Sequence, residues 1–414
     1  MEMRRKTIIL LVFLITMVTL TGCWDVIESD KRAYVMSLGI DKYEPPSPGE
    51  NEEEPAEEGG WRSEEEGGSV AVSTHAPRDT DRNRYTFTYA LPSFAFIMGE
   101  GEEANIFYHT VGQNLYSASR ILTTRLNRQV FFGHMQAIVI GEAVARDPKL
   151  FREILDAIER DPFISRRVDV TIASGNAKDV LTVEPNINPL TGEFIADIFR
   201  NKDRSPRSGG GIIGDVLQDL HRWGNTVIPR IIPGDGDIKV AGSAVIKNYQ
   251  MVGWLGEIET RAVEIIRGTA QPGGLTVIHE GEEGHEHIVP IDLIYLSSQY
   301  KLDKTGDGIK ITIDIETEGE IEQYFFNPEA DLLDPNIIRE LEGLVCEKLE
   351  MELGRTIEKL QQEFQVDVLA IDNYLRKYHP KLWNELEEDW EELYPNIEIV
   401  PNISTQIRRI GLTI

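Results

Sequence analysis

Two hydrophobic periods interleave along the first half of the chain. Alternating or fully apolar runs that are typical of strands occur at residues 33–40, 84–91, 135–141 and 168–172. Spacings of three to four residues predict helices between them, one from a Thr110 cap to Asn127 and one from the cap pair Asp147-Pro148 to Pro162. The first half is therefore expected to mix α and β structure.

The second half repeats this mixture with longer elements. Asn248-Tyr249 separates two apolar runs and predicts a hairpin. From Asp334-Pro335 to Phe364, apolar residues recur every three or four positions and predict one long amphipathic helix. The remaining expected elements are a helix at 257–267, strands at 293–302 and 309–315, a helix from Pro380, and one or two closing strands at 397–410.

The interleaved strands and helices predict an α+β fold. The expected divisions are a signal peptide at 1–22, an N-terminal α+β domain at 23–200, a linker with a middle domain at 201–288, and a C-terminal α+β domain at 289–414.

Residues 44–67 have a composition unlike the rest of the first domain. They hold ten glutamates, one arginine and four prolines, with almost nothing apolar. Such a segment cannot bury enough surface to order itself, so we expect a disordered acidic insertion in a surface loop. The alternative is a cation-sensing or partner-binding acidic arm.

The first 23 residues indicate export and lipid attachment. Three basic residues at 4–6 precede Thr7 to Leu20, an uncharged and mostly apolar stretch of 14 residues that is short for a bilayer span. Leu20-Thr21-Gly22-Cys23 follows with the pattern of a bacterial lipobox, which predicts a diacylglyceryl group on the Cys23 thiol. The alternative is a chance cysteine after an ordinary signal peptide.

Charge excludes several classes of partner. The 414 residues carry 42 basic and 70 acidic side chains, for a net charge of -28. Loss of residues 1–22 removes three basic and one acidic side chain and leaves -30. We expect no nucleic-acid binding, since counterion release needs a basic surface, and we expect membrane attachment through lipid instead of electrostatics.

Three patterns could carry chemistry, and each has a plainer interpretation. Gly209, Gly211 and Gly214 match a dinucleotide fingerprint, but charged residues and a proline precede them, which favours a flexible linker. The segment from His279 to His287 alternates histidines with carboxylates, but two glycines favour an acidic hairpin tip over a metal site. Cys346 lies beside a helical apolar stripe with no base nearby in sequence, which is typical of packing.

Other catalytic signals are missing. The sequence has no P-loop, no G-x-S-x-G elbow, no H-E-x-x-H, and no carboxylate pair recognised in an apolar frame. We therefore expect no enzyme activity, no catalytic or cofactor-binding residue and no metal ligand. Cys23, as the lipidated residue, is the single site predicted.

An ordered series of short motifs runs nearly the whole mature length. It comprises Cys23-Trp24-Asp25 with Glu28, Leu38-Gly39-Ile40-Asp41, Gly133-His134-Met135, Val139-Ile140-Gly141-Glu142, Arg160-Asp161-Pro162, Ala241-Gly242-Ser243-Ala244-Val245, Val252-Gly253-Trp254-Leu255, Leu360-Gln361, Asp367-Val368, Tyr374-Leu375, His379-Pro380, Trp383 and Ile407-Arg408-Arg409-Ile410-Gly411. This series resembles the Ger(x)C family of spore germination lipoproteins. The departures are the acidic insertion and Ala370, where the family pattern suggests glycine.

The resemblance implies a C subunit of a nutrient germinant receptor. Such a subunit is lipid-anchored on the outer surface of the spore inner membrane, has no known catalytic activity, and acts with a polytopic A subunit and an integral-membrane B subunit. The resemblance also implies an α+β fold of three mixed domains, each a mostly antiparallel sheet flanked by helices, after a lipoprotein signal peptide. This expectation agrees with the pattern of strands and helices above.

Two other classes of protein remain as alternatives. An extracytoplasmic solute-binding lipoprotein needs a ligand cleft between two doubly wound lobes, whereas strands here are often followed directly by strands. A surface hydrolase needs a catalytic constellation that the sequence does not show.

Overall fold

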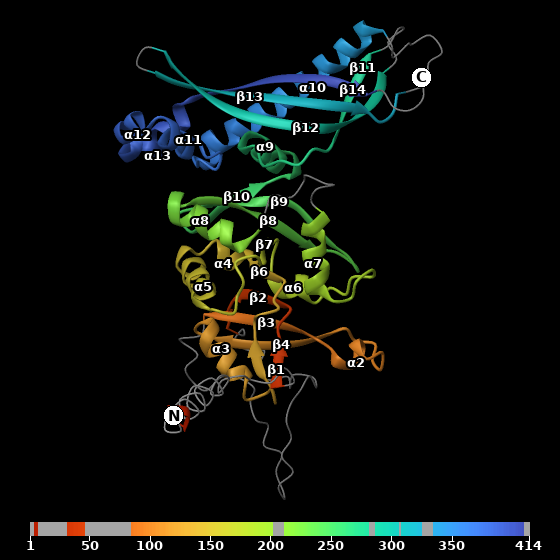
Figure 1. Ribbon diagram of the computed structural model, residues 1–414, viewed down its shortest axis with the longest axis vertical. Coiled ribbons are helices and arrows are strands. Elements are labelled where there is room, and N and C mark those ends of the chain that lie inside the picture. The colour runs from red at the N-terminus through yellow and green to blue at the C-terminus, as the bar shows by residue number, and fades with distance from the viewer. Residues whose placement is uncertain are drawn as a thin grey trace, which may run out of the picture.

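The computed structural model describes residues 4–6, 31–45, 84–201, 211–280, 286–305, 308–324 and 334–409. Within them lie three sheets, and the largest has eight strands in the order β10-β9-β8-β7-β6-β2-β3-β4. Figure 1 shows these strands stacked along the long axis of the molecule, from β10 at one end of the sheet to β4 at the other. The strands are β2 Ser37–Lys42, β3 Tyr85–Pro92, β4 Asn105–Gly112, β6 Ala137–Gly141, β7 Asp169–Ala173, β8 Asn225–Pro233, β9 Ile238–Lys247 and β10 Gln250–Leu255.

Helices cover both faces of the eight-stranded sheet. The apolar side chains of β6 explain why, because Ile138 and Ile140 enter one core while Ala137 and Val139 enter another. A strand buried on both faces is apolar throughout, which is the pattern of 135–141 in the sequence. The helices around this sheet are α2 Phe94–Ile97, α3 Leu115–Leu122, α4 Glu142–Ala145, α5 Pro148–Arg160, α6 Ala177–Leu181, α7 Thr191–Arg200 and α8 Ile213–Trp223.

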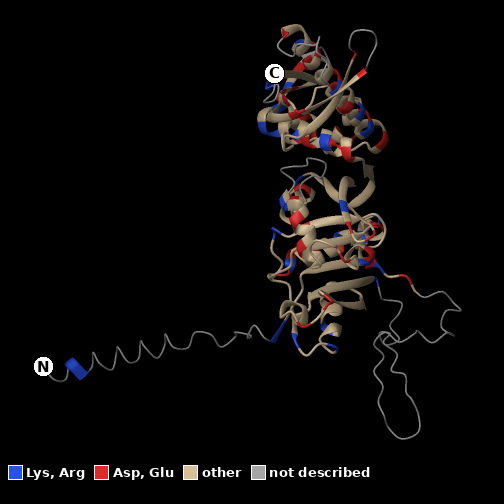
Figure 2. Cartoon of the chain, turned by 90° about the vertical axis from the view of Figure 1, so that its right-hand side faces the viewer, with Lys and Arg blue, Asp and Glu red and all other residues tan. Residues whose placement is uncertain are grey.

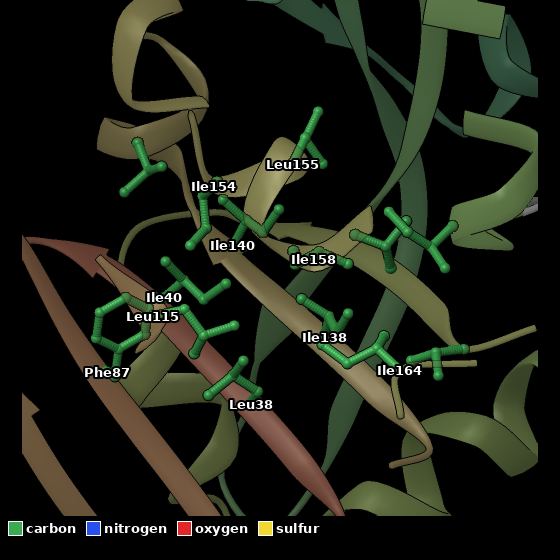
Figure 3. Close-up of a cluster of buried hydrophobic side chains, with 14 of the residues drawn as sticks. Leu38, Ile40, Phe87, Leu115, Ile138, Ile140, Ile154, Leu155, Ile158 and Ile164 are labelled. Atoms are coloured by element: carbon green, nitrogen blue, oxygen red, sulfur yellow. The ribbon is translucent and has the colours of Figure 1, made fainter. Parts of the chain in front are cut away.

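The larger core of this sheet lies beneath α3 and α5. Figure 3 shows Leu38 and Ile40 of β2 meeting Phe87 of β3 and Leu115 of α3, with Ile154 of α5 above β6. All five side chains are buried. The stripe of apolar residues predicted after Asp147-Pro148 is therefore the face by which α5 covers the sheet.

A second sheet of four strands lies beyond β10, in the order β11-β12-β13-β14. Its strands are β11 Gly274–Glu280, β12 Glu286–Thr305, β13 Gly308–Ile321 and β14 Glu398–Arg409. Its helical elements are α9 Glu257–Arg267, α10 Pro335–Glu358, the π-helical segment η6 Lys359–Phe364, α11 Ile371–Tyr378, α12 Pro380–Leu386, the 3₁₀ turns η7 Glu387–Asp389 and η8 Tyr394–Asn396, and α13 Trp390–Leu393. A third, two-stranded parallel sheet pairs β1 Arg32–Tyr34 with β5 Gln129–Phe131.

Local signals in the sequence account for several element ends. Asp147 and Asp334 cap α5 and α10 by accepting backbone N–H bonds, as their Asp-Pro pairs predict. Asn248 and Tyr249 both have positive φ between β9 and β10, the conformation of a two-residue hairpin turn. The Thr110 cap was wrong: Thr110 belongs to β4, and Asn114 caps α3 with a bond from the Ser117 N–H.

The α+β class is confirmed, with mixed sheets flanked by helices. The eight-stranded sheet is parallel at its centre, from β2 through β6 and β7 to β8, and antiparallel on either side. It unites strands on both sides of the predicted boundary at 200/201. The last strand of the first sheet, β10, ends at Leu255, and the first strand of the second sheet, β11, begins at Gly274. The three-domain division of the sequence itself stays a prediction.

Candidate functional site

Cys23, the predicted lipidation site, lies outside the described residues, as does most of the acidic insertion. Gly209 lies outside them too, while Gly211 precedes α8 and Gly214 is the second residue of that helix. The Gly211 carbonyl accepts from Val170 N–H at 2.6 Å, so this glycine runs beside β7 instead of following a strand. In the part of the chain that the structure describes, no cluster of three or more His, Cys, Asp or Glu side chains is placed to hold a metal ion.

The segment from His279 to His287, considered above as a metal site, contributes two histidines that face each other across two strands. His279 of β11 is the cross-strand partner of His287 of β12, with ring centroids 6.5 Å apart. His279 Nε2 lies 3.1 Å from Glu340 Oε2 on α10. Residues 281–285 are outside the described ranges. The contact between His279 and Glu340 thus joins the β11-β12 hairpin to α10.

Two motifs that are distant in sequence build one buried site around Asp41. The Asp41 carboxylate, at the end of β2, accepts the Ala177 N–H at 2.6 Å and the Lys178 N–H at 2.9 Å, and so caps α6 from another element. A Cβ on Gly141 would overlap Asp41 Oδ1, so the glycine leaves room for the carboxylate. Burial raises the pKa of Asp41, and the two backbone hydrogen bonds oppose that rise. This arrangement holds α6 against β2 and β6.

A second buried carboxylate site lies at the start of α11. Asp367 accepts backbone N–H bonds from Leu369 at 3.0 Å, Ile371 at 3.3 Å and Asp372 at 2.9 Å. Both Asp367 and Asp372 are 5% exposed. No carboxylate pair in an apolar frame was expected from the sequence, and the structure shows one in Asp367 and Asp372. The signal was two aspartates five residues apart in an otherwise apolar run.

The two carboxyls titrate as a coupled pair. Burial raises the pKa of both carboxyls, and the charge of Asp367 helps to raise the pKa of Asp372 to about 8. Three backbone N–H groups oppose the rise in the pKa of Asp367. A shifted pKa is common at catalytic sites, but these oxygens are committed to the protein's own backbone. The pair is suited to fixing a chain reversal.

Side chains from three other segments close this site. Arg267, at the end of α9, donates from Nε to the Val368 carbonyl at 2.6 Å. Tyr300 of β12 donates its hydroxyl hydrogen toward two carbonyl oxygens, Ile266 O at 2.9 Å and Leu369 O at 2.7 Å. We call Arg267, Tyr300, Asp367 and Asp372 the Asp367 cluster. It joins α9, β12 and α11 within the second sheet's layer.

The Asp367 cluster also reaches the first sheet. Arg267 Nη1 lies 3.7 Å from Asp219 Oδ2 on α8, and both side chains are largely buried. Lys247 Nζ, at the end of β9, donates to the Gln365 carbonyl at 3.0 Å. A Cβ on Gly253 would overlap the Phe364 ring, so the glycine of the Val252-Gly253-Trp254-Leu255 motif lets η6 approach β10 closely. The motif residues therefore build the junction between the two sheets.

Ala370 stands where the family pattern suggests glycine, and its backbone conformation explains that preference. Its backbone has φ 63° and ψ 33°, the left-handed conformation that glycine adopts at least cost. A family preference for glycine there follows from the turn between Asp367 and α11. The chain keeps the turn with alanine and bears the backbone strain.

Two protein-family models match the chain, one in its N-terminal part and one in its C-terminal part. The model for "Spore germination protein N-terminal domain" matches residues 69–233, and the model for "Spore germination B3/ GerAC like, C-terminal" matches residues 241–411. The chain is similar to spore germination protein YndF of Bacillus subtilis (strain 168), with 24% identity over 99% of this chain and 98% of the relative. It is also similar to spore germination protein B3 of the same organism, with 23% identity over 95% and 96%.

A solved structure supports the fold independently. The crystal structure of the GerBC protein superposes with a TM-score of 0.55 at 21% identity, covering 79% of this chain and 94% of that one. The two family models together span most of the chain, and their ranges contain the quoted motifs from Gly133 onward. The chain therefore belongs to the Ger(x)C family of spore germination proteins.

Proposed function

We propose that this chain is the lipid-anchored, non-catalytic C subunit of a nutrient germinant receptor. It is held on the outer surface of the spore inner membrane by a diacylglyceryl group on Cys23, and it assembles with the membrane-embedded A and B subunits. The observation that carries the proposal is the match to spore germination proteins over nearly the whole chain.

The use of buried polar groups supports a non-catalytic role. The carboxylate oxygens of Asp41 and Asp367 accept hydrogen bonds from backbone N–H groups. The Arg267 guanidinium donates to the Val368 carbonyl and lies beside Asp219. These contacts fix secondary elements in place and leave few lone pairs or donors for a substrate. They suit a rigid subunit that couples its partners by assembly.

The lipobox supports the mode of attachment. Among the described residues, no helix is long and apolar enough to cross a membrane. Two acyl chains on Cys23 would hold the protein stably, since one chain alone is marginal. The anchor would confine the search for membrane partners to a surface and raise their effective concentration.

The solute-binding alternative fits the sheets less well. It requires two doubly wound lobes, whereas the second sheet pairs β11, β12 and β13 antiparallel and has a single parallel pairing, between β13 and β14.

Co-purification from spore inner membranes tests the proposal. Wild-type protein and Cys23→Ala would be captured through an affinity tag after mild detergent extraction, and their partners identified by mass spectrometry. We expect wild type to recover both membrane subunits and Cys23→Ala to be depleted from the membrane fraction. Recovery of a transporter permease, or of no partner by wild type, would overturn the receptor assignment.

A further inference from the structure

The surface around α2 and α3 has an unusual charge composition. In a chain with 70 acidic residues, Asn105 to Gly141 contains none, while Arg120, Arg125 and Arg128 lie within it. All three arginines are exposed, on α3 and the turn that follows it. Figure 2 shows blue segments at this lower end of the molecule.

Exposed apolar side chains lie beside one of these arginines, Arg128. Phe94, Ile97 and Met98, in and directly after α2, are 63%, 57% and 64% exposed. The Arg128 guanidinium lies 5.5 Å from the Phe94 ring centroid, which places α2 against the basic turn. We call Phe94, Ile97, Met98, Arg120, Arg125 and Arg128 the α2–α3 surface. Arginine beside apolar and aromatic groups is suited to the boundary between lipid headgroups and acyl chains.

The chain's entry point fixes this surface relative to the membrane. Arg32, the first residue of β1, pairs in register with Gln129 of β5, the neighbour of Arg128. Arg32 lies nine positions after Cys23, and a chain of that length reaches at most about 30 Å when fully extended. A lipid on Cys23 therefore keeps the basic turn close to the bilayer.

We propose that the α2–α3 surface binds the headgroup layer of an anionic phospholipid bilayer. The inference rests on the proposed function, because the anchor brings this surface to the membrane. The net charge of the whole chain opposes such binding only weakly, since charges more than about 10 Å from the bilayer are screened at physiological salt. Arginines within reach of phosphates add attraction that the anchor alone does not supply. The second contact orients the long axis away from the membrane.

Glutamates beside the surface make the proposal sharper. Glu100, Glu102 and Glu103 are exposed in the loop that follows α2. Their charge opposes an anionic bilayer, so their removal should strengthen binding if headgroups contact this surface. A surface that faces solvent would show no such response.

Vesicle sedimentation of the unlipidated mature chain, residues 23–414 with Cys23→Ala, tests the proposal. Vesicles would contain phosphatidylcholine alone or an equal mixture with phosphatidylglycerol, at low and high salt. We expect at least tenfold stronger binding to the anionic vesicles, lost at high salt. Arg120→Gln with Arg128→Gln should reduce binding at least tenfold, and Glu100→Gln with Glu102→Gln and Glu103→Gln should increase it.

A matched control separates local from total charge. Arg339→Gln with Arg355→Gln removes two exposed arginines from α10, far along the chain, and should leave binding unchanged. Circular dichroism would establish that each variant is folded. Equal binding by all variants, or no preference for anionic vesicles, would overturn the proposal. If the Arg120 and Arg128 variant instead lost the A or B subunit in the co-purification while vesicle binding was absent, the surface would be a protein interface and the receptor assignment would stand.

Discussion

Gly141 makes room for Asp41: these residues end neighbouring parallel strands, and any side chain at position 141 would overlap the Asp41 carboxylate. The carboxylate in turn caps α6 on the same edge of the sheet. Two motifs a hundred residues apart thus serve one packing relationship.

Gly141→Ala should therefore destabilise the protein. The added methyl group must displace Asp41 from the α6 N-terminus or shift a buried strand, and overpacking of this kind costs about 1–3 kcal/mol. Chemical denaturation would measure the loss. Gly343→Ala is the matched control, because a Cβ there meets nothing within 4 Å and alanine favours the α10 helix by about 0.5–1 kcal/mol. Equal stability of Gly141→Ala and wild type would contradict the role given to this glycine.

Ala370→Gly should stabilise the protein. Alanine at φ 63° bears a left-handed backbone that costs about 1–2 kcal/mol, and glycine relieves it at the expense of some unfolded-state entropy. We expect a net gain of about 0.5–1 kcal/mol in the free energy of unfolding. Ala157→Gly, in the middle of α5, should instead lose about 1 kcal/mol. A loss at both positions would mean that Ala370 does not hold the left-handed conformation in solution.

Asp372→Asn should change how stability depends on pH. In the folded protein the pKa of Asp372 is raised from 3.8 to about 8, mainly by burial. Between those values the native state holds a proton that the unfolded chain releases, so this group's contribution is full below about pH 4 and is lost as pH rises toward 8. Relative to Asp372→Asn, wild type should lose at least about 1 kcal/mol between pH 5 and 8.

Urea unfolding at several pH values would measure this difference. Exposed Asp389→Asn serves as the control and should follow wild type. If the free energy of unfolding depended on pH in the same way for wild type and Asp372→Asn, the raised pKa of Asp372 would be contradicted.

The junction between the sheets should show energetic coupling. Arg267 and Asp219 approach to 3.7 Å across it in a largely buried setting, so a double-mutant cycle with Arg267→Gln and Asp219→Asn should give about 1 kcal/mol. The exposed Arg160 and Asp156 pair on α5 should give a smaller coupling energy. A coupling energy near zero for the buried pair would mean that other contacts hold the two sheets together.

Sequence patterns were sufficient where the determining contacts are local. The α5 cap at Asp147 and the turn at Asn248 depend on neighbouring residues, and both were predicted. The Thr110 cap failed because pairing of β4 with β3 outweighs a local capping preference. The continuous eight-stranded sheet could not be predicted, since strand order depends on packing between distant segments. The role of Asp367 was hidden for the same reason, because Arg267 and Tyr300 reach it from elements far away in the chain.

Germination should report the lipid anchor and the α2–α3 surface together. If the anchor and the surface both attach the protein to the membrane, each can partly compensate for loss of the other. Two membrane contacts that are individually weak combine into stable attachment. Cys23→Ala should slow nutrient germination, Arg120→Gln with Arg128→Gln should slow it less, and the combined variant should be more defective than either. Germination would be followed by the fall in optical density, with abundance checked by immunoblot and Arg339→Gln with Arg355→Gln as the control. A combined variant no worse than Cys23→Ala would remove the surface from the mechanism while leaving the anchor in it, and normal germination by Cys23→Ala at normal abundance would remove the anchor.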